Sequence, residues 1–377
     1  MSTQTKSSEI VLDYVKTIGI VNNGYNGRGF ANPYDIAVGG DGRIFVLNRC
    51  DPARASAIRV GICNLEDEYL GEFGRGFGAG DEQFAWPVAM VLDNRHRLHI
   101  TDEHNHRVTT YDTSGDTSGN ASAKYLSHWG KPGTGDGELN GPAGIAVDSS
   151  DNLFVVDQHN SRVQKFTSDG KFIANWGSFG GGDGQFNLPW GAAVDKDDNV
   201  YIADWRNNRI QKFTNDGEFL AAFGNSGEGE GQFQRPTSVA VDPEGFIYVA
   251  DWGNERVQVL GPDGSFQMIL RGEATVSKWA EAYFDSNPEE KAERDISNLK
   301  PELPAHLNTP YHISSQTEPY FWGPVSVSLD REGRLYVTET NRHRFQVYQK
   351  RYTVPHPQPH LTFFESDRSR SYESRCL

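Results

Sequence analysis

The sequence predicts an all-β fold, a six-bladed β-propeller of four-stranded blades, and three observations support this prediction. The chain of 377 residues contains 40 Gly and 12% aromatic residues, which indicates many short strands and tight turns. Equivalent aspartates recur 47 residues apart at Asp157, Asp204 and Asp251. Six copies of an alternating strand pattern each begin at a proline. These prolines are Pro33, Pro87, Pro142, Pro189, Pro236 and Pro324.

Each complete copy contains four short strand patterns, here named a to d from the start of the copy. In the copy that begins at residue 142 they read GIAVD, NLFVVD, RVQKF and FIANWG. Asp-Gly pairs at residues 169–170, 216–217 and 263–264 supply the positive φ angles that a tight turn between strands c and d requires. These period-2 patterns favour strands over helices.

The ends of the repeat predict how the ring closes. The last copy lacks a strand d after Tyr348, whereas the N-terminal sequence EIVLDYVKTIG matches the d pattern. We therefore expect residues 10–19 to form the outermost strand of blade six, which would remove two exposed sheet edges. Residues 1–350 are predicted to be one propeller domain, and the polar, proline-containing residues 351–377 a disordered tail.

The pattern DxxNxR that follows strand b resembles the NHL repeat family. It occurs as Asp102/Asn105/Arg107, Asp157/Asn160/Arg162, Asp204/Asn207/Arg209 and Asp251/Asn254/Arg256. The resemblance implies the propeller fold but not one function, because members of the family include binding scaffolds, sensor domains and enzymes. We expect each Asp to pair with its Arg and stabilise the loop between strands b and c.

Composition limits the classes of partner and the compartment. A net charge of −15 disfavours nucleic acid and anionic membrane surfaces, and the sequence has no apolar run long enough to span a membrane. Cys50, Cys63 and Cys376 are too few and too widely spaced for a disulfide framework and are expected to be free thiols. These features predict a cytoplasmic protein with no nucleic-acid or membrane partner.

The largest break in the repeat lies between blades five and six. Asp251 and Glu339 are 88 residues apart, 41 more than one repeat, and the stretch ATVSKWAEAYFDSNPEEKAERDISNL is predicted to be helical. Loops from d to a and from b to c leave the same face of a propeller. We therefore expect the insertion, residues 273–320, to cover the channel mouth on that face as a lid, or to plug the channel.

Side chains that differ between copies on this face are the candidate site. We predict catalytic roles for His104 and His159 as acid or base, and for Arg206 as the group that holds an anion. His106 is expected to point outward. The predicted ligand-binding residues are Tyr34, Asp35, Glu103, Trp190, Trp205, Trp252, Trp322 and Asn341.

The chain is also distantly similar to peptidylglycine amidating lyase, a six-bladed enzyme whose zinc ligands are histidines directly after the strand a proline. The matching positions are Tyr34, Val88, Ala143, Trp190, Thr237 and Val325, so that zinc site is absent. A different divalent metal site stays open, formed by His104 and His159 with Glu103 or His312. The sequence has no nucleotide-cofactor motif.

The sequence leaves two functions open. One is a small-molecule enzyme of the lyase or hydrolase type with an aromatic, His and Arg pocket at the lidded mouth. The alternative is a noncatalytic propeller scaffold that binds a protein or peptide on the same face. A lid over the mouth would favour the enzyme, whereas an open mouth would favour the scaffold.

Overall fold

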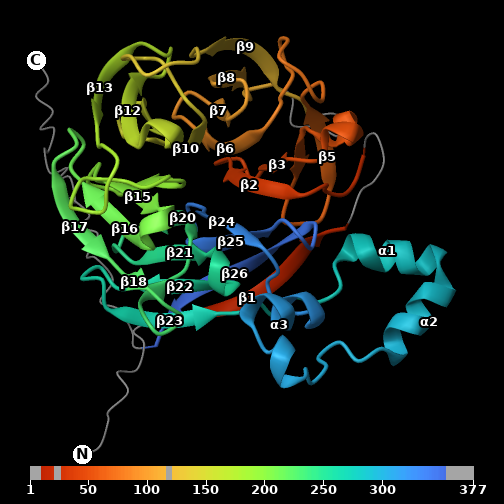
Figure 1. Cartoon of the computed structure of the whole chain (residues 1–377). Coiled ribbons are helices and arrows are strands. Elements are labelled where there is room, and N and C mark those ends of the chain that lie inside the picture. Colours follow the sequence, from red (N-terminus) through yellow and green to blue (C-terminus); the bar gives the residue numbers. More distant parts are fainter. Residues whose placement is uncertain (1–9, 21–26, 116–120, 354–377) are drawn as a thin grey trace, which may run out of the picture.

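The structure is a computed structural model that describes residues 10–20, 27–115 and 121–353. Six four-stranded antiparallel sheets form a ring, with one strand of each sheet at the centre (Figure 1). The predicted six-bladed propeller is therefore confirmed. Predictions for Cys376 and for most of the tail fall outside the described residues.

The strands of each blade follow one another along the chain from the channel outward. Blade one contains β2 (Pro33–Val38), β3 (Ile44–Asn48), β4 (Val60–Cys63) and β5 (Tyr69–Phe73). Blade two contains β6 (Pro87–Leu92), β7 (Arg97–Asp102), β8 (Arg107–Asp112) and β9 (Lys124–Trp129). Blade three contains β10 (Pro142–Val147), β11 (Asn152–Asp157), β12 (Arg162–Thr167) and β13 (Phe172–Trp176).

Blades four and five repeat this order. Blade four contains β14 (Ala192–Val194), β15 (Val200–Asp204), β16 (Arg209–Phe213) and β17 (Phe219–Phe223). Blade five contains β20 (Pro236–Val241), β21 (Ile247–Asp251), β22 (Arg256–Leu260) and β23 (Phe266–Leu270). Between them, β18 (Asn225–Ser226) and β19 (Gln232–Phe233) form a short parallel pair. The Asp-Gly turns have the expected positive φ, for example 81° at Gly170 and 90° at Gly217.

Blade six is completed by the N-terminal strand, as the sequence predicts. It contains β24 (Pro324–Leu329), β25 (Arg334–Glu339) and β26 (Arg344–Tyr352), and β1 (Ile10–Gly19) pairs antiparallel with β26 from Ile10↔Tyr352 to Gly19↔Arg344. The ring is thus closed by strands from both ends of the chain. Strand β26 extends two residues past the domain boundary expected at residue 350.

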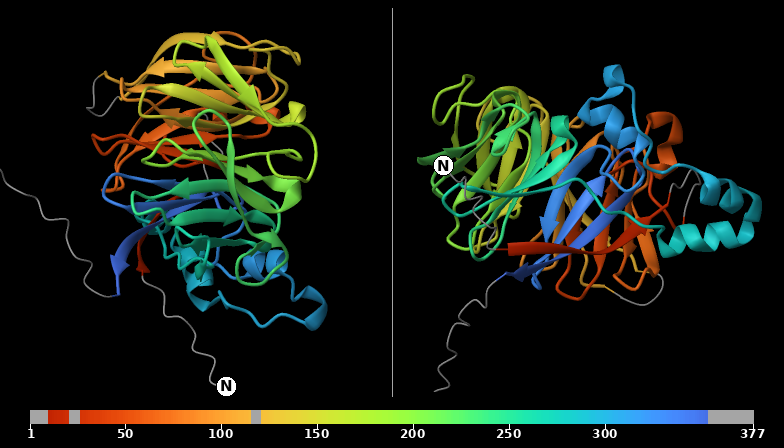
Figure 2. Two further views of the ribbon diagram at one scale, coloured as in Figure 1. Left: turned by 90° about the vertical axis from the view of Figure 1, so that its left-hand side faces the viewer. Right: turned by 90° about the horizontal axis from the view of Figure 1, so that it is seen from below.

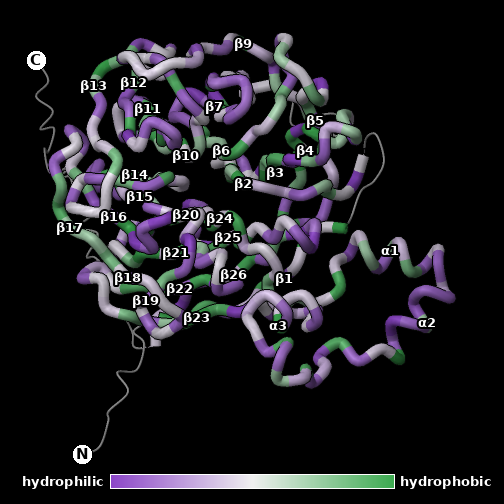
Figure 3. Tube along the Cα trace, viewed as in Figure 1, coloured by the Kyte–Doolittle hydropathy of each residue, from purple (hydrophilic) through white to green (hydrophobic). Residues whose placement is uncertain are grey.

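Apolar side chains fill the spaces between neighbouring blades, and the hydrophobic residues concentrate in the strands of the ring (Figure 3). Trp129 of blade two packs against Phe166 of blade three, with 4.6 Å between ring centroids. Trp176 and Phe213 repeat this contact one blade later, at 5.9 Å. The free thiols of Cys50 and Cys63 are buried.

The repeated Asp, Asn and Arg form the predicted link in three blades. Asp157–Arg162, Asp204–Arg209 and Asp251–Arg256 are joined at 2.7, 2.9 and 2.7 Å, and each Arg also donates to carbonyls of the loop that enters its blade. Blade two differs. Arg107 donates to the carbonyls of Ala79, Gly80 and Gln83 and makes no ion pair with Asp102.

A second contact joins neighbouring blades. It comes from the residue before strand c, which adopts the left-handed conformation at His106, Asn208, Glu255 and His343. Each of these side chains accepts a hydrogen bond from the backbone N–H that precedes the proline of the next blade. The donors are Gly141, Arg235, Gly323 and Asn32, respectively.

Glu255 makes the stability of the ring depend on pH. Its carboxylate accepts from Gly323 N at 2.6 Å between blades five and six, and burial raises its pKa from 4.5 to about 7, with a further contribution from Glu339. Because the folded pKa is raised, this contribution to stability is fully present below pH 4.5 and is lost as the pH rises through about 7.

We expect Glu255→Gln to raise the free energy of unfolding at pH 8 by on the order of 2–3 kcal/mol relative to wild type. Near pH 4 the two proteins should have the same free energy of unfolding. Urea unfolding at both pH values measures the difference. The glutamine oxygen can still accept from Gly323, while the buried charge is gone. Exposed Glu290 provides the control substitution. A Glu255→Gln effect that is equal at both pH values would contradict this assignment.

The insertion lies mainly outside the ring. Helices α1 (Lys278–Ser286) and α2 (Pro288–Ile296) extend beyond the outer rim beside blade one, in the region predicted to be helical (Figures 1 and 2). Helix α3 (Pro310–Gln316) returns to the b-to-c face, where Arg342 donates to the carbonyls of Ser314 and Ser315 at 3.0 and 3.1 Å. Among the described residues, no helix is long and apolar enough to cross a membrane.

A tryptophan at the start of α1 explains this position. Trp279 is 3% exposed and packs against Phe30, 5.4 Å away, in the core between blades six and one. Its indole N–H donates to the carbonyl of Asp67 at 2.6 Å, and Ser277 donates to the carbonyl of Gly19. The expectation of a lid or plug is therefore wrong for α1 and α2, because Trp279 anchors them at the outer seam of the ring.

Candidate functional site

The candidate site lies on the face that carries the loops from strand b to strand c. A pocket of about 360 Å3 opens there at blades one to three, here called the mouth pocket. It is lined by Arg49, Trp86, Glu103, His104, His106 and His159. Three of the predicted site residues, Glu103, His104 and His159, therefore lie together.

An arginine at the centre of the mouth pocket organises its charged groups. The Arg49 guanidinium lies 4.7 Å from the Tyr34 ring centroid and 4.6 Å from that of Trp86, and it donates to Glu103 at 3.0 Å. The other oxygen of Glu103 is 4.0 Å from His159 Nε2. One nitrogen of Arg49, Nη1, is buried without a hydrogen-bond partner among the described residues.

Backbone hydrogen bonds hold these loops in place. Arg49 N–H donates to Asn32 O at 3.0 Å, Glu103 N–H to Trp86 O at 2.9 Å, and His159 N–H to Asn140 O at 3.0 Å. The loops between strands b and c are therefore fixed against the residues that precede each central strand. Side chains at the mouth are thus positioned by the scaffold itself.

His106 also lines the mouth pocket, so the expectation that it points outward is wrong. Its φ of 51° turns the side chain toward blade three, where Nδ1 accepts from Gly141 N at 3.1 Å. An accepting Nδ1 places the proton of the neutral ring on Nε2. His106 therefore presents its Nε2–H as a hydrogen-bond donor.

Arg206 does not join His104 and His159. It lies in blade four with its guanidinium 5.5 Å from the Trp205 ring, and Arg235 lies 5.3 Å from the same ring. Trp190 and Trp205 have centroids 6.1 Å apart. These four residues form a separate group, here called the blade-four cluster.

The remaining predicted residues lie at blades five and six and inside the channel. Trp322 contacts Tyr311 of α3 and Arg342, at 5.9 and 5.3 Å, and the Asn341 N–H donates to the Trp322 carbonyl at 3.3 Å. Trp252 begins the turn that α3 contacts. Asp35 and Tyr34 line the central channel.

Sequence reasoning missed Arg49 as a site residue, although a signal for it was present. The positions compared between copies were those after the strand b aspartate, and blade one has Asn48 there, followed by Arg49. Including the first copy in that comparison selects Arg49. Its pairing with Glu103, by contrast, depends on two adjacent blades and has no sequence signature.

The proposed histidine metal site does not assemble with His312. That residue lies on α3, and its Nδ1 is 2.8 Å from Thr309 Oγ1. In the part of the chain that the structure describes, no group of three or more His, Cys, Asp and Glu residues is arranged to hold a metal ion. Glu103 is instead oriented by Arg49.

Comparison with known proteins supports the repeat assignment. The NHL repeat model matches residues 139–166, 186–213, 233–260 and 321–348, which begin before strand a and end with strand c of blades three to six. A relative in Arabidopsis thaliana, protein SUPPRESSOR OF QUENCHING 1, chloroplastic, is 28% identical over 150 residues. That match covers 36% of this chain and 14% of the length of the Arabidopsis protein.

Solved structures share the fold at low sequence identity. A protein of unknown function from Bacteroides thetaiotaomicron is 16% identical with a TM-score of 0.61, covering 91% of this chain and 77% of that one. A catalytically inactive virginiamycin B lyase from Staphylococcus aureus, solved with quinupristin, is 14% identical with a TM-score of 0.50, covering 90% and 99%. The chain is therefore a six-bladed β-propeller, and the NHL repeat model matches four of its blades.

Proposed function

We propose that the chain binds a small anionic molecule in the mouth pocket and acts on it by acid–base chemistry, as a lyase or hydrolase. The observation that carries this proposal is the chain of contacts from Arg49 through Glu103 to His159, beside His104, in one pocket. A base oriented by a carboxylate is a recurring arrangement for proton transfer.

Each residue has a distinct role in this proposal. Arg49 is sandwiched between two aromatic rings and lines the pocket, where its guanidinium would pair with a carboxylate or phosphate. His159 is the general base, and Glu103 Oε1 lies 4.0 Å from its Nε2. His104 lines the same pocket and serves as the acid that protonates the leaving group.

The likeness to virginiamycin B lyase is consistent with a lyase, but at 14% identity it supports only the fold. The residues of the mouth pocket therefore carry the proposal. Arg49 replaces Arg206 as the anion-binding group, because Arg206 lies in the blade-four cluster.

A panel of small carboxylates and phosphate esters tests the proposal by thermal shift, followed by NMR detection of turnover. Arg49→Gln should weaken binding at least tenfold. His159→Gln should lower turnover about 10²- to 10⁴-fold while leaving the dissociation constant within about threefold. Binding that is lost in Arg206→Gln and retained in Arg49→Gln would move the site to the blade-four cluster and overturn the proposal.

A noncatalytic scaffold that binds a protein or peptide is the second candidate. It is favoured by the position of α1 and α2, which leave the mouth uncovered (Figure 1). The blade-four cluster adds Trp and Arg side chains, the residue types that dominate binding energy at protein interfaces. If no panel member binds, and Trp205→Ala abolishes capture of a defined protein partner, the scaffold is the function.

A further inference from the structure

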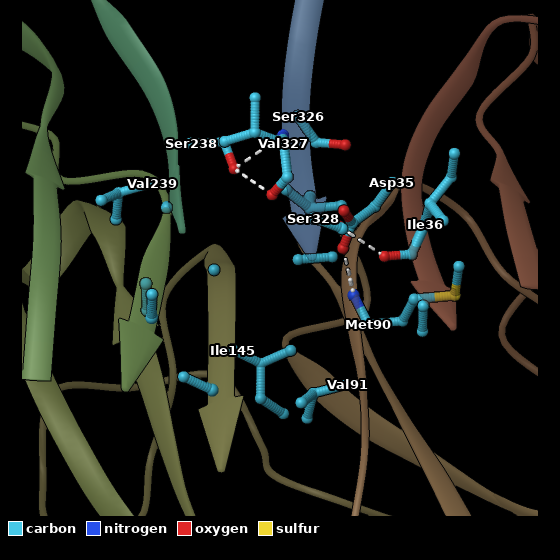
Figure 4. A pocket seen from close by; sticks show the side chains of 18 of the residues that line it. Asp35, Ile36, Met90, Val91, Ile145, Ser238, Val239, Ser326, Val327 and Ser328 are labelled. Carbon is cyan, nitrogen blue, oxygen red and sulfur yellow. Dashed lines mark hydrogen bonds between the residues drawn. The ribbon is translucent and has the colours of Figure 1, made fainter. Parts of the chain in front are cut away.

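The central channel contains a cavity of about 320 Å3, separate from the mouth pocket, that is lined by the inner strand of every blade. Figure 4 shows its wall, where the polar side chains come from blades five, six and one. They include Asp35, Ser238, Ser326 and Ser328. Blades two to four present small or apolar residues such as Ala89, Gly144, Ile145 and Ala192. The cavity therefore has one polar side and one apolar side.

Asp35 is the charged group of this cavity. The residues at the same place in the other inner strands are Ala89, Gly144, Gly191, Ser238 and Ser326. Asp35 Oδ2 accepts from Met90 N at 2.8 Å, and among the described residues it makes no ion pair. Burial raises the pKa of Asp35 to about 7, although hydrogen bonds from the Met90 and Ile36 N–H groups and from the Ser326 hydroxyl act in the opposite direction.

The carboxylates at the other end of the channel behave differently. A second cavity of about 520 Å3 shares Val38, Leu92 and Leu329 with the first and is also lined by aspartates. Asp93, Asp242 and Asp330 in its wall pair with Arg97, Lys350 and Arg334. A carboxylate that faces a cavity without a cationic partner is favoured in its protonated form, and a cationic ligand would favour the ionised form.

The serine hydroxyls near Asp35 direct their hydrogens to the protein. Ser328 donates to the carbonyl of Ile36 at 2.7 Å, and the Ser326 hydroxyl lies 2.9 Å from Thr338 Oγ1 and within hydrogen-bond reach of Asp35. The Ser238 hydroxyl donates to the carbonyl of Val327 at 3.5 Å. Ser238 Oγ already accepts from Val327 N at 3.2 Å, but a hydroxyl oxygen has two lone pairs, so this side of the cavity still suits a ligand that donates hydrogen bonds. Thr237 lines the same cavity, and its buried Oγ1 has no hydrogen-bond partner within the described residues.

We propose that the channel cavity binds a small organic ammonium ion, with its nitrogen against Asp35 and its hydrocarbon part against blades two to four. A single carboxylate and hydroxyl acceptors match an ammonium group with several N–H donors. Calcium would require six to eight oxygen ligands, several of them usually carboxylates. The net charge of −15 also favours entry of cations over anions.

Calorimetry with n-butylammonium tests this site, with n-butanol as the neutral analogue and calcium chloride alone as the metal probe. At pH 8 we expect n-butylammonium to bind at least tenfold more tightly than n-butanol. The Asp35→Asn variant should bind n-butylammonium and n-butanol with equal affinity. The affinity should fall about tenfold for each pH unit below about 7, as Asp35 becomes protonated.

Glu255→Gln is the matched control, because Glu255 is also a buried carboxylate with its pKa raised to about 7 but lies between blades five and six. It should bind n-butylammonium like wild type. Equal binding of n-butanol and n-butylammonium would show a plain apolar cavity and overturn the proposal. Calcium binding that Asp35→Asn abolishes, or n-butylammonium binding that survives in Asp35→Asn, would also overturn it. None of these results bears on the mouth pocket.

Discussion

Replacing Asp251 with asparagine is expected to lower the free energy of unfolding by about 3–5 kcal/mol. Asp251 is 0% exposed and accepts from Gln234 N, Asn254 and Arg256, the last at 2.7 Å. Arg256 in turn donates to the carbonyls of Gly229 and Gln232, so the pair joins two loops. Asparagine keeps the size of the side chain but leaves the Arg256 charge buried without its counter-ion.

Burial raises the pKa of Asp251 even though Arg256 lies beside it. Desolvation therefore outweighs the attraction within the pair, and the pair need not be more stable than an apolar replacement of both partners. Removing one partner is nevertheless costly. The double variant Asp251→Asn/Arg256→Met should recover part of the loss, and urea unfolding of the two single variants and the double variant measures the coupling.

Blade two provides the matched control. Asp102 is also 0% exposed and accepts from Ala85 N, Trp86 N and Asn105, but Arg107 does not pair with it. Asp102→Asn should therefore cost only about 1–3 kcal/mol, the effect of a lost buried hydrogen bond. If both substitutions cost the same, the ion pair contributes nothing specific to the loss and the interpretation of Asp251 is wrong.

The sequence was sufficient to predict the blades because the signals that define them are local and repeat. Alternating strands, Asp-Gly turns and a proline before each central strand recur along the chain. A copy with a weak strand pattern can therefore be assigned by comparison with the clearer copies. The missing outer strand of the last copy and the unpaired N-terminal strand pattern also predicted β1 correctly. A closed ring leaves no other place for residues 10–19.

The features that escaped prediction depend on contacts between distant segments. The helical character of residues 278–296 was visible, but their position follows from Trp279, which packs against Phe30 and donates to Asp67 O across more than 200 residues of sequence. The pairing of Arg49 with Glu103 likewise joins two blades. Blade two has Thr109 where the other copies have a glutamine that donates to the aspartate, but the sequence does not show that Arg107 would bond to the preceding loop instead of Asp102.

The predicted site residues do not form one group in the structure. Loop direction predicted that His104, Trp205 and Trp322 lie at loops of one face. Blade geometry then separates them around the ring, so that Glu103, His104 and His159 share a pocket while Arg206 lies with Trp205. Equivalent residues of the six blades are spread around the channel axis. Their side chains share a pocket only where those of neighbouring blades are long enough to come into contact.

Deleting residues 1–20 is expected to prevent folding or to lower the melting temperature by more than about 10 °C. The deletion removes β1, whose side chains Ile10, Leu12 and Ile18 are 0, 6 and 0% exposed. At about 1.5–3 kcal/mol for each buried side chain, the loss is about 5–9 kcal/mol, comparable with the whole stability of a typical domain. It also exposes the edge of β26, whose backbone groups then lack partners.

A synthetic peptide of residues 10–20 distinguishes loss of this strand from a general effect of truncation. Added to the truncated chain, it should pair with β26 and raise the melting temperature in proportion to the logarithm of its concentration. A peptide of the same composition in scrambled order should not, because the buried pattern of Ile10, Leu12 and Ile18 is lost. An unchanged melting curve after the deletion, or equal rescue by both peptides, would show that β1 does not close the ring in solution.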